Sequence, residues 1–179
     1  MLTKEEAKEY WYEKQRLAQQ AMEGHRECNG ILIECASKVL EDGLHPDSEF
    51  RARLDRTIEL YHKLCQENEV VHIYVPGSLH KENGVSDQCT LSTAGRRYLI
   101  ERGIPDVIIL GDRENEQYKG NEGVLNSADE CFVASRIFFD GKYRELHCVC
   151  SPIQVTRKWF YYLEFGLVPL IHSVPVVDS

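Results

Sequence analysis

Short apolar runs alternate with longer amphipathic segments along this chain of 179 residues. The short runs have the length of buried strands, and the longer segments repeat apolar residues every three or four positions, as helices that cover a sheet do. This order predicts a mostly parallel sheet of about five strands with helices on both faces, which is a three-layer α/β/α fold. The predicted strands are residues 31–34, 70–75, 107–110, 146–150 and 168–172, and the predicted helices are residues 3–22, 50–64, 91–102, 121–139 and 151–165.

The first predicted helix stands outside this alternation. Apolar residues such as Ala7, Trp11 and Ala18 form one side of it, while Glu, Lys and Gln fill the other side. We therefore expect an N-terminal helical extension over residues 1–27 and a single α/β domain over residues 28–179. That length is sufficient for one hydrophobic core.

Charge and hydropathy narrow the range of partners. A formal net charge of -8 and a pI near 5.4 argue against nucleic-acid binding, because phosphate contacts need clustered Lys and Arg and these residues are scattered. No apolar run approaches the ~18 residues of a membrane span. We expect a soluble, cytoplasmic protein with neither a nucleic acid nor a membrane as partner.

The chain has seven cysteines, without a CxxC pair or a Cys/His spacing typical of zinc. An odd number in this arrangement predicts reduced thiols rather than a disulfide framework or a structural metal. Cys148 and Cys150 lie two positions apart in a predicted strand, so they share one face of it, where we interpret them as small buried apolar residues.

Candidate chemistry lies in the loops that follow the strands, because open parallel sheets bind ligands beyond the carboxyl ends of their strands. The chain contains no GxGxxG, GxxxxGK(S/T), HExxH or GxSxG motif, which removes the standard dinucleotide, P-loop, metalloprotease and hydrolase interpretations. The long connection over residues 76–90 is the most irregular of these loops. The candidate ligand-binding residues are Gly77, Ser78, Asn121, Ser151, Gln154 and Arg157, and the candidate catalytic residue is Asp112.

The segment from Ser151 to Gln154 has the S-x-x-Q pattern of a helix capping box, with Pro152 at the first helical position. The N–H groups that such a cap leaves unpaired favour an anion at the helix start. Arg157 is expected to lean back toward the same helix start. It either offers a bidentate fork to a phosphate or carboxylate, or pairs with an acid on the surface.

Asp112 and Asn121 are the candidates after the third predicted strand. Asp112 comes directly after Gly111 at the strand end, where it can accept a hydrogen bond from a sugar hydroxyl, act as a general base or hold a cation. Asn121 is expected to cap the next helix, and its amide can also donate to a ligand.

Three stretches carry short motifs in a distinctive order: FRARLDRTIELY at residues 50–61, LSTAGRRYLIERGIPDVIIL at residues 91–110 and SPIQVTRKWFYYLEFGL at residues 151–167. Together with the Asn121 helix start they resemble the ElyC/SanA/YdcF family, a domain of unknown function, from about residue 31 to the C-terminus. The resemblance implies a Rossmann-like α/β fold and a nucleotide-like ligand such as S-adenosylmethionine.

The chain also departs from the family pattern. Glu34-Cys35-Ala36 stands where the family has a Gly-Gly turn, Thr93 replaces an acidic residue, and Gln154 replaces a histidine. Glutamine cannot act as a general acid or base, so proton transfer through that position is lost or moved.

Two classes of function follow from these observations. In the first, the protein binds a small anionic or nucleotide-like ligand at the strand-end crevice, with Arg157 and the Ser151 helix start on the anion and Asp112 on a hydroxyl or amine, and it acts as a transferase or hydrolase. In the second, it is a non-catalytic ligand-sensing or protein-interaction module. The helix from Trp159 to Phe165 is apolar nearly all round, which indicates either burial or a partner surface such as a homo-oligomer contact.

Overall fold

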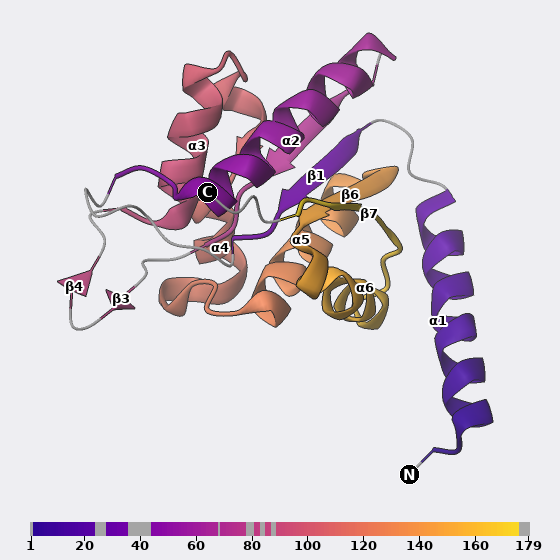
Figure 1. Ribbon diagram of the computed structural model, residues 1–179. Coiled ribbons are helices and arrows are strands. Elements are labelled where there is room, and N and C mark those ends of the chain that lie inside the picture. The colour runs from indigo at the N-terminus through magenta and orange to yellow at the C-terminus, as the bar shows by residue number, and fades with distance from the viewer. Residues whose placement is uncertain are drawn as a thin grey trace.

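A five-stranded parallel sheet with strand order β5-β2-β1-β6-β7 forms the centre of the protein (Figure 1). The computed structural model describes residues 2–23, 28–35, 44–67, 69–77, 81–82, 85–86 and 89–175. The predicted three-layer α/β/α fold with an N-terminal helix is confirmed. The strands of the sheet are β1 (Asn29–Ile33), β2 (Val71–Tyr74), β5 (Ile109–Leu110), β6 (Glu145–Cys150) and β7 (Pro169–Ser173).

The central strand β1 is buried along its whole length, because it has a strand on each side and helices on both faces. Its side chains alternate between two cores. Ile31 and Ile33 face a core built with α2 and α3, and Leu32 faces a core built with α5 and α6. A strand buried on both faces must be continuously apolar, as residues 31–33 are.

The helices form two outer layers (Figure 1). Those packed on the Ile31 side lie between β1 and β5 in the chain, and those on the Leu32 side follow β5. The helices are α1 (Lys4–Glu23), α2 (Ser48–Gln66), α3 (Leu91–Glu101), α4 (Asp112–Lys119), α5 (Ser127–Gly141) and α6 (Val155–Glu164), with short 3-10 turns η1 (Asp106–Ile108), η2 (Gly120–Glu122) and η3 (Pro152–Gln154).

The order of the strands places a topological switch point between β1 and β6. The chain runs outward from β1 through β2 to β5, then returns to the other side of β1 and continues through β6 to β7. Connections on either side of such a point lead away from each other, which leaves a crevice at the carboxyl ends of the two strands.

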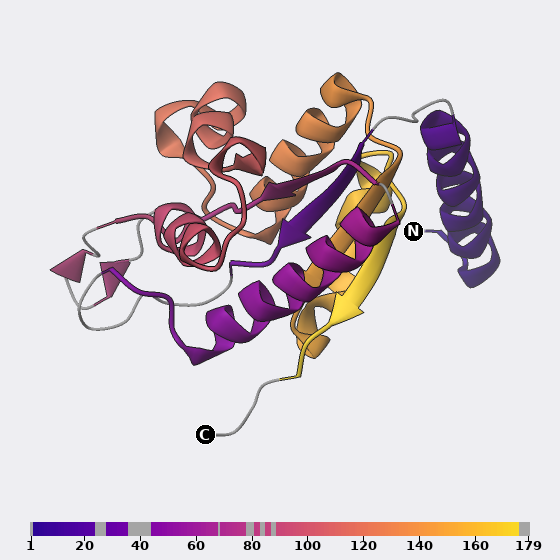
Figure 2. The same ribbon diagram turned by 90° about the horizontal axis from the view of Figure 1, so that it is seen from above.

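Helix α1 lies at one side of the sheet, opposite the small hairpin of β3 (Lys81–Glu82) and β4 (Val85–Ser86) (Figure 2). It packs against α6 through Trp11 and Phe160, whose ring centroids are 4.5 Å apart. Glu164 of α6 accepts a hydrogen bond of 3.0 Å from the Tyr10 hydroxyl and pairs with Lys14 at 3.3 Å. Within the described residues, no helix is both long and apolar enough to cross a membrane.

The predicted helix over residues 121–139 is wrong at its start. Its actual N-cap is Asn126, whose side chain accepts from the N–H of Asp129 at 3.0 Å, and Asn121 lies instead in η2. The interruption has a backbone cause, because Gly120 and Gly123 adopt φ values of 67° and 69°, which a continuous right-handed helix does not allow.

Helix α4 lies between the predicted strand over residues 107–110 and the predicted helix over residues 121–139, where the sequence pattern predicts no helix. Its N-cap is Gly111, and the Glu114 carboxylate accepts from the Gly111 N–H at 2.7 Å. The predicted strand over residues 107–110 is shortened to β5, because its first half forms η1. Val107 is accordingly 87% exposed.

Gly30 is required by the contact between β1 and α5. A Cβ atom added at Gly30 would lie 1.7 Å from Cζ of Phe138. We expect Gly30→Ala to destabilise the fold by about 1–3 kcal/mol, since the ring is held in a filled core. Urea unfolding measures this change.

The matched control for Gly30→Ala is a second change that removes the clash. Phe138→Leu in the Gly30→Ala background should recover part of the loss, so the two effects are not additive. Full additivity in this double-mutant cycle would show that the ring contact is not the cause.

A histidine pair links β6 to β7. Nδ1 of His147 lies 3.0 Å from Nε2 of His172, and Nε2 of His147 lies 3.2 Å from a carboxylate oxygen of Glu145. Burial lowers the pKa of both histidines, and that of His172 falls to about 4.

Because these histidines have lower pKa values folded than unfolded, the unfolded chain binds more protons in acid. Their contribution to stability is complete above about pH 6.5 and is lost as the pH falls toward about 4. We expect a loss of about 1 kcal/mol by urea unfolding across this range, a modest value since His172 is only half buried. His172→Phe should flatten this dependence, and exposed His62→Asn should leave it intact. An unchanged profile in His172→Phe would contradict the assignment.

Candidate functional site

Buried polar side chains gather at the carboxyl ends of β1 and β6, on either side of the switch point. Glu34 is the first residue after β1, and Ser151 is the first residue after β6. Glu34 is completely buried and Ser151 is 8% exposed. The edge where the topology predicts a ligand crevice therefore carries buried polar side chains.

The Glu34 carboxylate connects the two strand ends. Its Oε2 accepts hydrogen bonds from the Ser151 backbone N–H at 2.7 Å and from the Ser151 hydroxyl at 3.0 Å. Its Oε1 is also buried, yet it has no hydrogen-bond partner within the described residues. One oxygen is thus structural, and the other is an unused acceptor.

Arg53 brings a buried guanidinium to the same place from α2. It is 2% exposed, and its Nε donates to the backbone carbonyl of Glu34 at 2.8 Å. Its Nη2 is buried and makes no hydrogen bond to any part of the chain that the structure describes. Such an N–H is costly to leave without an acceptor, so it marks a place where a ligand oxygen would be stabilised.

A second pair of buried charges lies beside the first. Lys158 of α6 is completely buried and forms an ion pair with Glu130 of α5, which is 6% exposed. The other oxygen of Glu130 accepts from the Cys35 backbone N–H at 3.4 Å, which joins this pair to the end of β1. Burial opposes the charge of Lys158, but the Glu130 carboxylate outweighs it and raises the pKa of Lys158.

The cysteines near this edge are buried, as the sequence predicts for Cys148 and Cys150. Burial raises the pKa of Cys35 well above its usual value. The Cys35 thiol is therefore protonated at neutral pH, and it is a poor nucleophile. In the described ranges, no group of three or more His, Cys, Asp and Glu side chains is arranged to hold a metal ion.

Ser151 and Gly77 are sequence-predicted residues that lie at this site. Ser151 contacts Glu34 as described, and Gly77 lies at the end of the neighbouring strand β2 with a φ of 110°. A Cβ at Gly77 would come within 2.7 Å of the Leu91 side chain and 3.1 Å of the Cys35 side chain. Glycine is therefore needed for the strand end to pack against its neighbours. Ser78 lies outside the described residues.

The predicted capping box at Ser151 is not formed. Ser151 makes no side-chain hydrogen bond to the following turn, because its hydroxyl donates to Glu34 instead. Gln154 does not reach back to complete the box, and its Oε1 is buried without a partner in the described chain. Ser151 and Gln154, which the local sequence pattern predicts as a helix cap, therefore lie at the edge of the sheet without forming that cap.

Asp112 lies further along the same edge, at the first position of α4. Its Oδ2 accepts hydrogen bonds from the hydroxyls of Thr90 at 2.7 Å and Thr93 at 2.8 Å. Since β5 is separated from β1 by β2, Asp112 is about 10 Å across the sheet from the Glu34 end. Only an extended ligand would reach both positions.

Arg157 and Asn121 are both exposed. Within the described part of the chain, Arg157 forms neither a hydrogen bond nor an ion pair, so the surface pairing considered from the sequence is not present. The buried cation of α6 is its neighbour, Lys158.

The sequence interpretation missed the charged residues that form this site. They are Glu34, Arg53, Glu130 and Lys158. A signal for them exists, because each charged residue falls where the apolar pattern predicts burial. Glu34 continues an apolar strand, and Lys158 lies one turn before Tyr162 on the apolar side of its helix.

The fold and the site define the class as a three-layer α/β protein with a polar switch point. No protein-family model matches the chain, and searches of curated proteins and of solved structures found no match.

Removing Lys158 should leave the Glu130 carboxylate buried without its counter-charge. We expect Lys158→Met to destabilise the fold by about 3–5 kcal/mol in urea unfolding. Arg157→Met is the matched control, since it removes the adjacent charge from an exposed position, and it should change stability by less than about 0.5 kcal/mol. Equal effects of the two changes would contradict the role of the buried pair.

Proposed function

We propose that this chain is an ElyC/SanA/YdcF-type protein that binds a small anionic or nucleotide-like ligand, such as S-adenosylmethionine, at the strand ends between β1 and β6. Arg53 holds the anionic group of the ligand, and Glu34 accepts from a ligand hydroxyl or amine. The observation that carries the proposal is the pair of buried, unpartnered atoms, Glu34 Oε1 and Arg53 Nη2, at the switch point.

The chemistry of these two atoms limits the ligand class. Oε1 is an acceptor, and Nη2 is a donor with a positive charge. A molecule that carries both an anionic oxygen and an N–H or O–H group complements both of them. An α-amino acid, a sugar phosphate and a nucleotide each have this combination, whereas a simple hydrocarbon has neither group.

The site is close to neutral before a ligand binds, because two buried acids accompany two buried cations. A ligand whose single anionic group is accompanied by a protonated amine preserves this balance. Charge steering therefore contributes little, and recognition depends on direct hydrogen bonds in a buried setting.

Asp112 extends the proposal to catalysis as a transferase or hydrolase. One of its oxygens is fixed by two threonine hydroxyls, which orients the carboxylate at the edge where a hydroxyl or amine of an extended ligand would lie. The exposed cation Arg157 is available for a second anionic group of such a ligand.

The second candidate function is a non-catalytic ligand-sensing or interaction module. It is favoured by Gln154, which lies at the edge with a buried amide oxygen and cannot transfer a proton. Ligand-dependent stability without turnover would identify this function. A cytoplasmic location is part of both proposals, since the buried thiols Cys35, Cys131, Cys148 and Cys150 are in the reduced form.

The proposal is tested by thermal unfolding with S-adenosylmethionine, nucleotides and sugar phosphates. A ligand at a concentration of about 100 times its Kd should raise Tm by about 5–10 °C for a chain of this size. Arg53→Lys should remove this shift, because lysine keeps the charge but loses the planar fork.

Arg56→Lys is the control, since Arg56 is exposed on the same helix and pairs with Glu59 at 2.9 Å. Each shift is referred to the unliganded Tm of the same variant. A ligand shift that survives in Arg53→Lys would remove Arg53 from the site, and no shift with any compound of the panel would overturn the proposed ligand class.

A further inference from the structure

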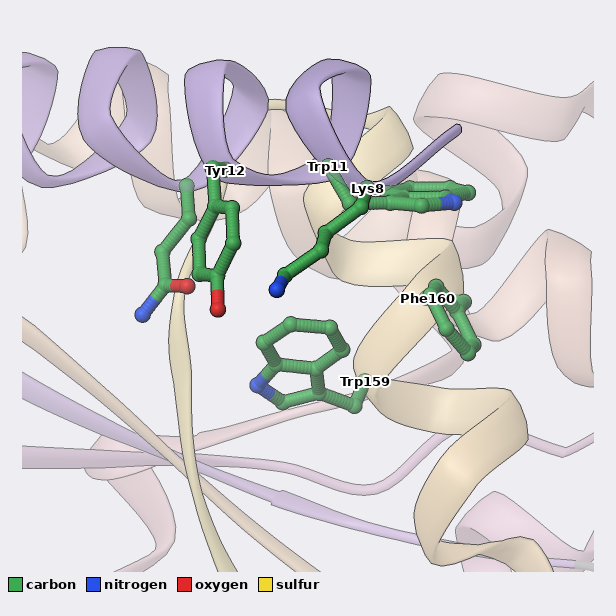
Figure 3. A pocket seen from close by; sticks show the side chains of 6 residues that line it. Lys8, Trp11, Tyr12, Trp159 and Phe160 are labelled. Atoms are coloured by element: carbon green, nitrogen blue, oxygen red, sulfur yellow. The ribbon is translucent and has the colours of Figure 1, made fainter. Parts of the chain in front are cut away.

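A pocket lies between α1 and α6, away from the strand ends (Figure 3). Its volume is about 210 Å³, and its walls are mainly aromatic. The lining residues are Lys8, Trp11, Tyr12 and Gln15 of α1 and Trp159 and Phe160 of α6.

The two helices that form this pocket are held together by contacts in its wall and beside it. Trp11 packs on Phe160, and Glu164 of α6 binds both Tyr10 and Lys14 of α1. These contacts set the separation of the two helices without filling the space between Tyr12 and Trp159. In Figure 3 the side chains of Lys8 and Tyr12 extend from α1 toward the indole of Trp159.

Aromatic walls favour a flat ring. Stacked or edge-to-face ring contacts contribute beyond simple area burial, and Trp and Tyr supply them from opposite helices. The volume is below the roughly 300–1,000 Å³ of sites for drug-sized ligands, so the pocket suits a compound with a single ring.

Lys8 favours a negatively charged ligand in this pocket. It is the one charged residue of the lining, its Nζ lies 5.7 Å from the centroid of the Tyr12 ring, and it forms no ion pair with a described residue. The Glu164 carboxylate of α6 already binds the Tyr10 hydroxyl and the Lys14 ammonium of α1. An ammonium that lines the pocket attracts an anion and repels a cation, even though aromatic walls alone would accept a cation.

We propose that this pocket is a binding site for a small aromatic carboxylate. The ring lies between Tyr12 and Trp159, and the carboxylate pairs with Lys8. This site is separate from the strand-end site, and neither assignment depends on the other.

The experiment uses tryptophan fluorescence of the full chain with phenylpropionate as the probe. The chain has two tryptophans, and both line the pocket, so occupancy changes the emission directly. Phenylpropanol and phenylpropylamine supply the neutral and cationic versions of the same ring. We expect saturable binding in the order carboxylate, alcohol, amine.

Two variants separate the charge from the ring. Lys8→Met should weaken phenylpropionate binding about fivefold and leave phenylpropanol binding unchanged. Lys63→Met removes the same charge on α2, across the sheet, and should have no effect. Tyr12→Ala should weaken binding of all the probes, whereas Leu17→Ala, an exposed truncation on the same helix, should not.

Both truncated side chains are largely exposed, with Tyr12 at 62% and Leu17 at 50%, so these variants are expected to fold. The proposal is overturned if no probe gives a saturable change, if the amine binds as tightly as the carboxylate, or if Lys8→Met and Lys63→Met behave alike. A shift in protein size on adding phenylpropionate would reveal self-association as the source of the signal and would also overturn it.

Discussion

The buried Glu34 carboxylate fixes the two central strands to each other where they end. Its side chain is completely buried, and within the described residues it accepts hydrogen bonds from the N–H and the hydroxyl of Ser151. Nε of Arg53, on α2, donates a hydrogen bond to the backbone carbonyl of Glu34. This bond connects the helical layer of α2 and α3 to the same edge. The carboxyl edge of the sheet is therefore polar, while residues 31–33 of the central strand are apolar.

A buried network of this kind is costly unless every polar group has a partner, and at this edge Glu34 Oε1, Arg53 Nη2 and Gln154 Oε1 have none within the described chain. Natural sequences depart from full satisfaction mainly at functional sites. Glu130 and Lys158 differ from these groups, because their side chains form an ion pair with each other. Glu130 also accepts a hydrogen bond from the backbone N–H of Cys35. We therefore interpret this pair as support for the edge, and the unpartnered groups as its binding surface.

The fold was predictable because it depends on local patterns. Residues 31–33 have the continuous apolar pattern of a strand buried on both faces, and the helix predicted over residues 50–64 is present as α2, where Asp47 accepts from the Phe50 N–H at 2.8 Å. The start of α5 was not predictable in the same way, because the apolar stripe continues through a segment that two glycines with positive φ interrupt. Hydrophobic periodicity indicates which face of a helix is buried, but it does not indicate where the backbone adopts a positive φ.

The candidate site was predicted in position but not in composition. By itself the sequence determined the alternation of strands and helices, the edge of the sheet that carries the candidate site and the presence of Ser151 there, since these follow from hydrophobic period and parallel topology. Only the tertiary structure decided that Ser151 binds Glu34 rather than capping its helix, and that Lys158 rather than Arg157 is the buried cation of α6. Both outcomes depend on partners more than 25 residues away in the chain, which local spacing does not encode.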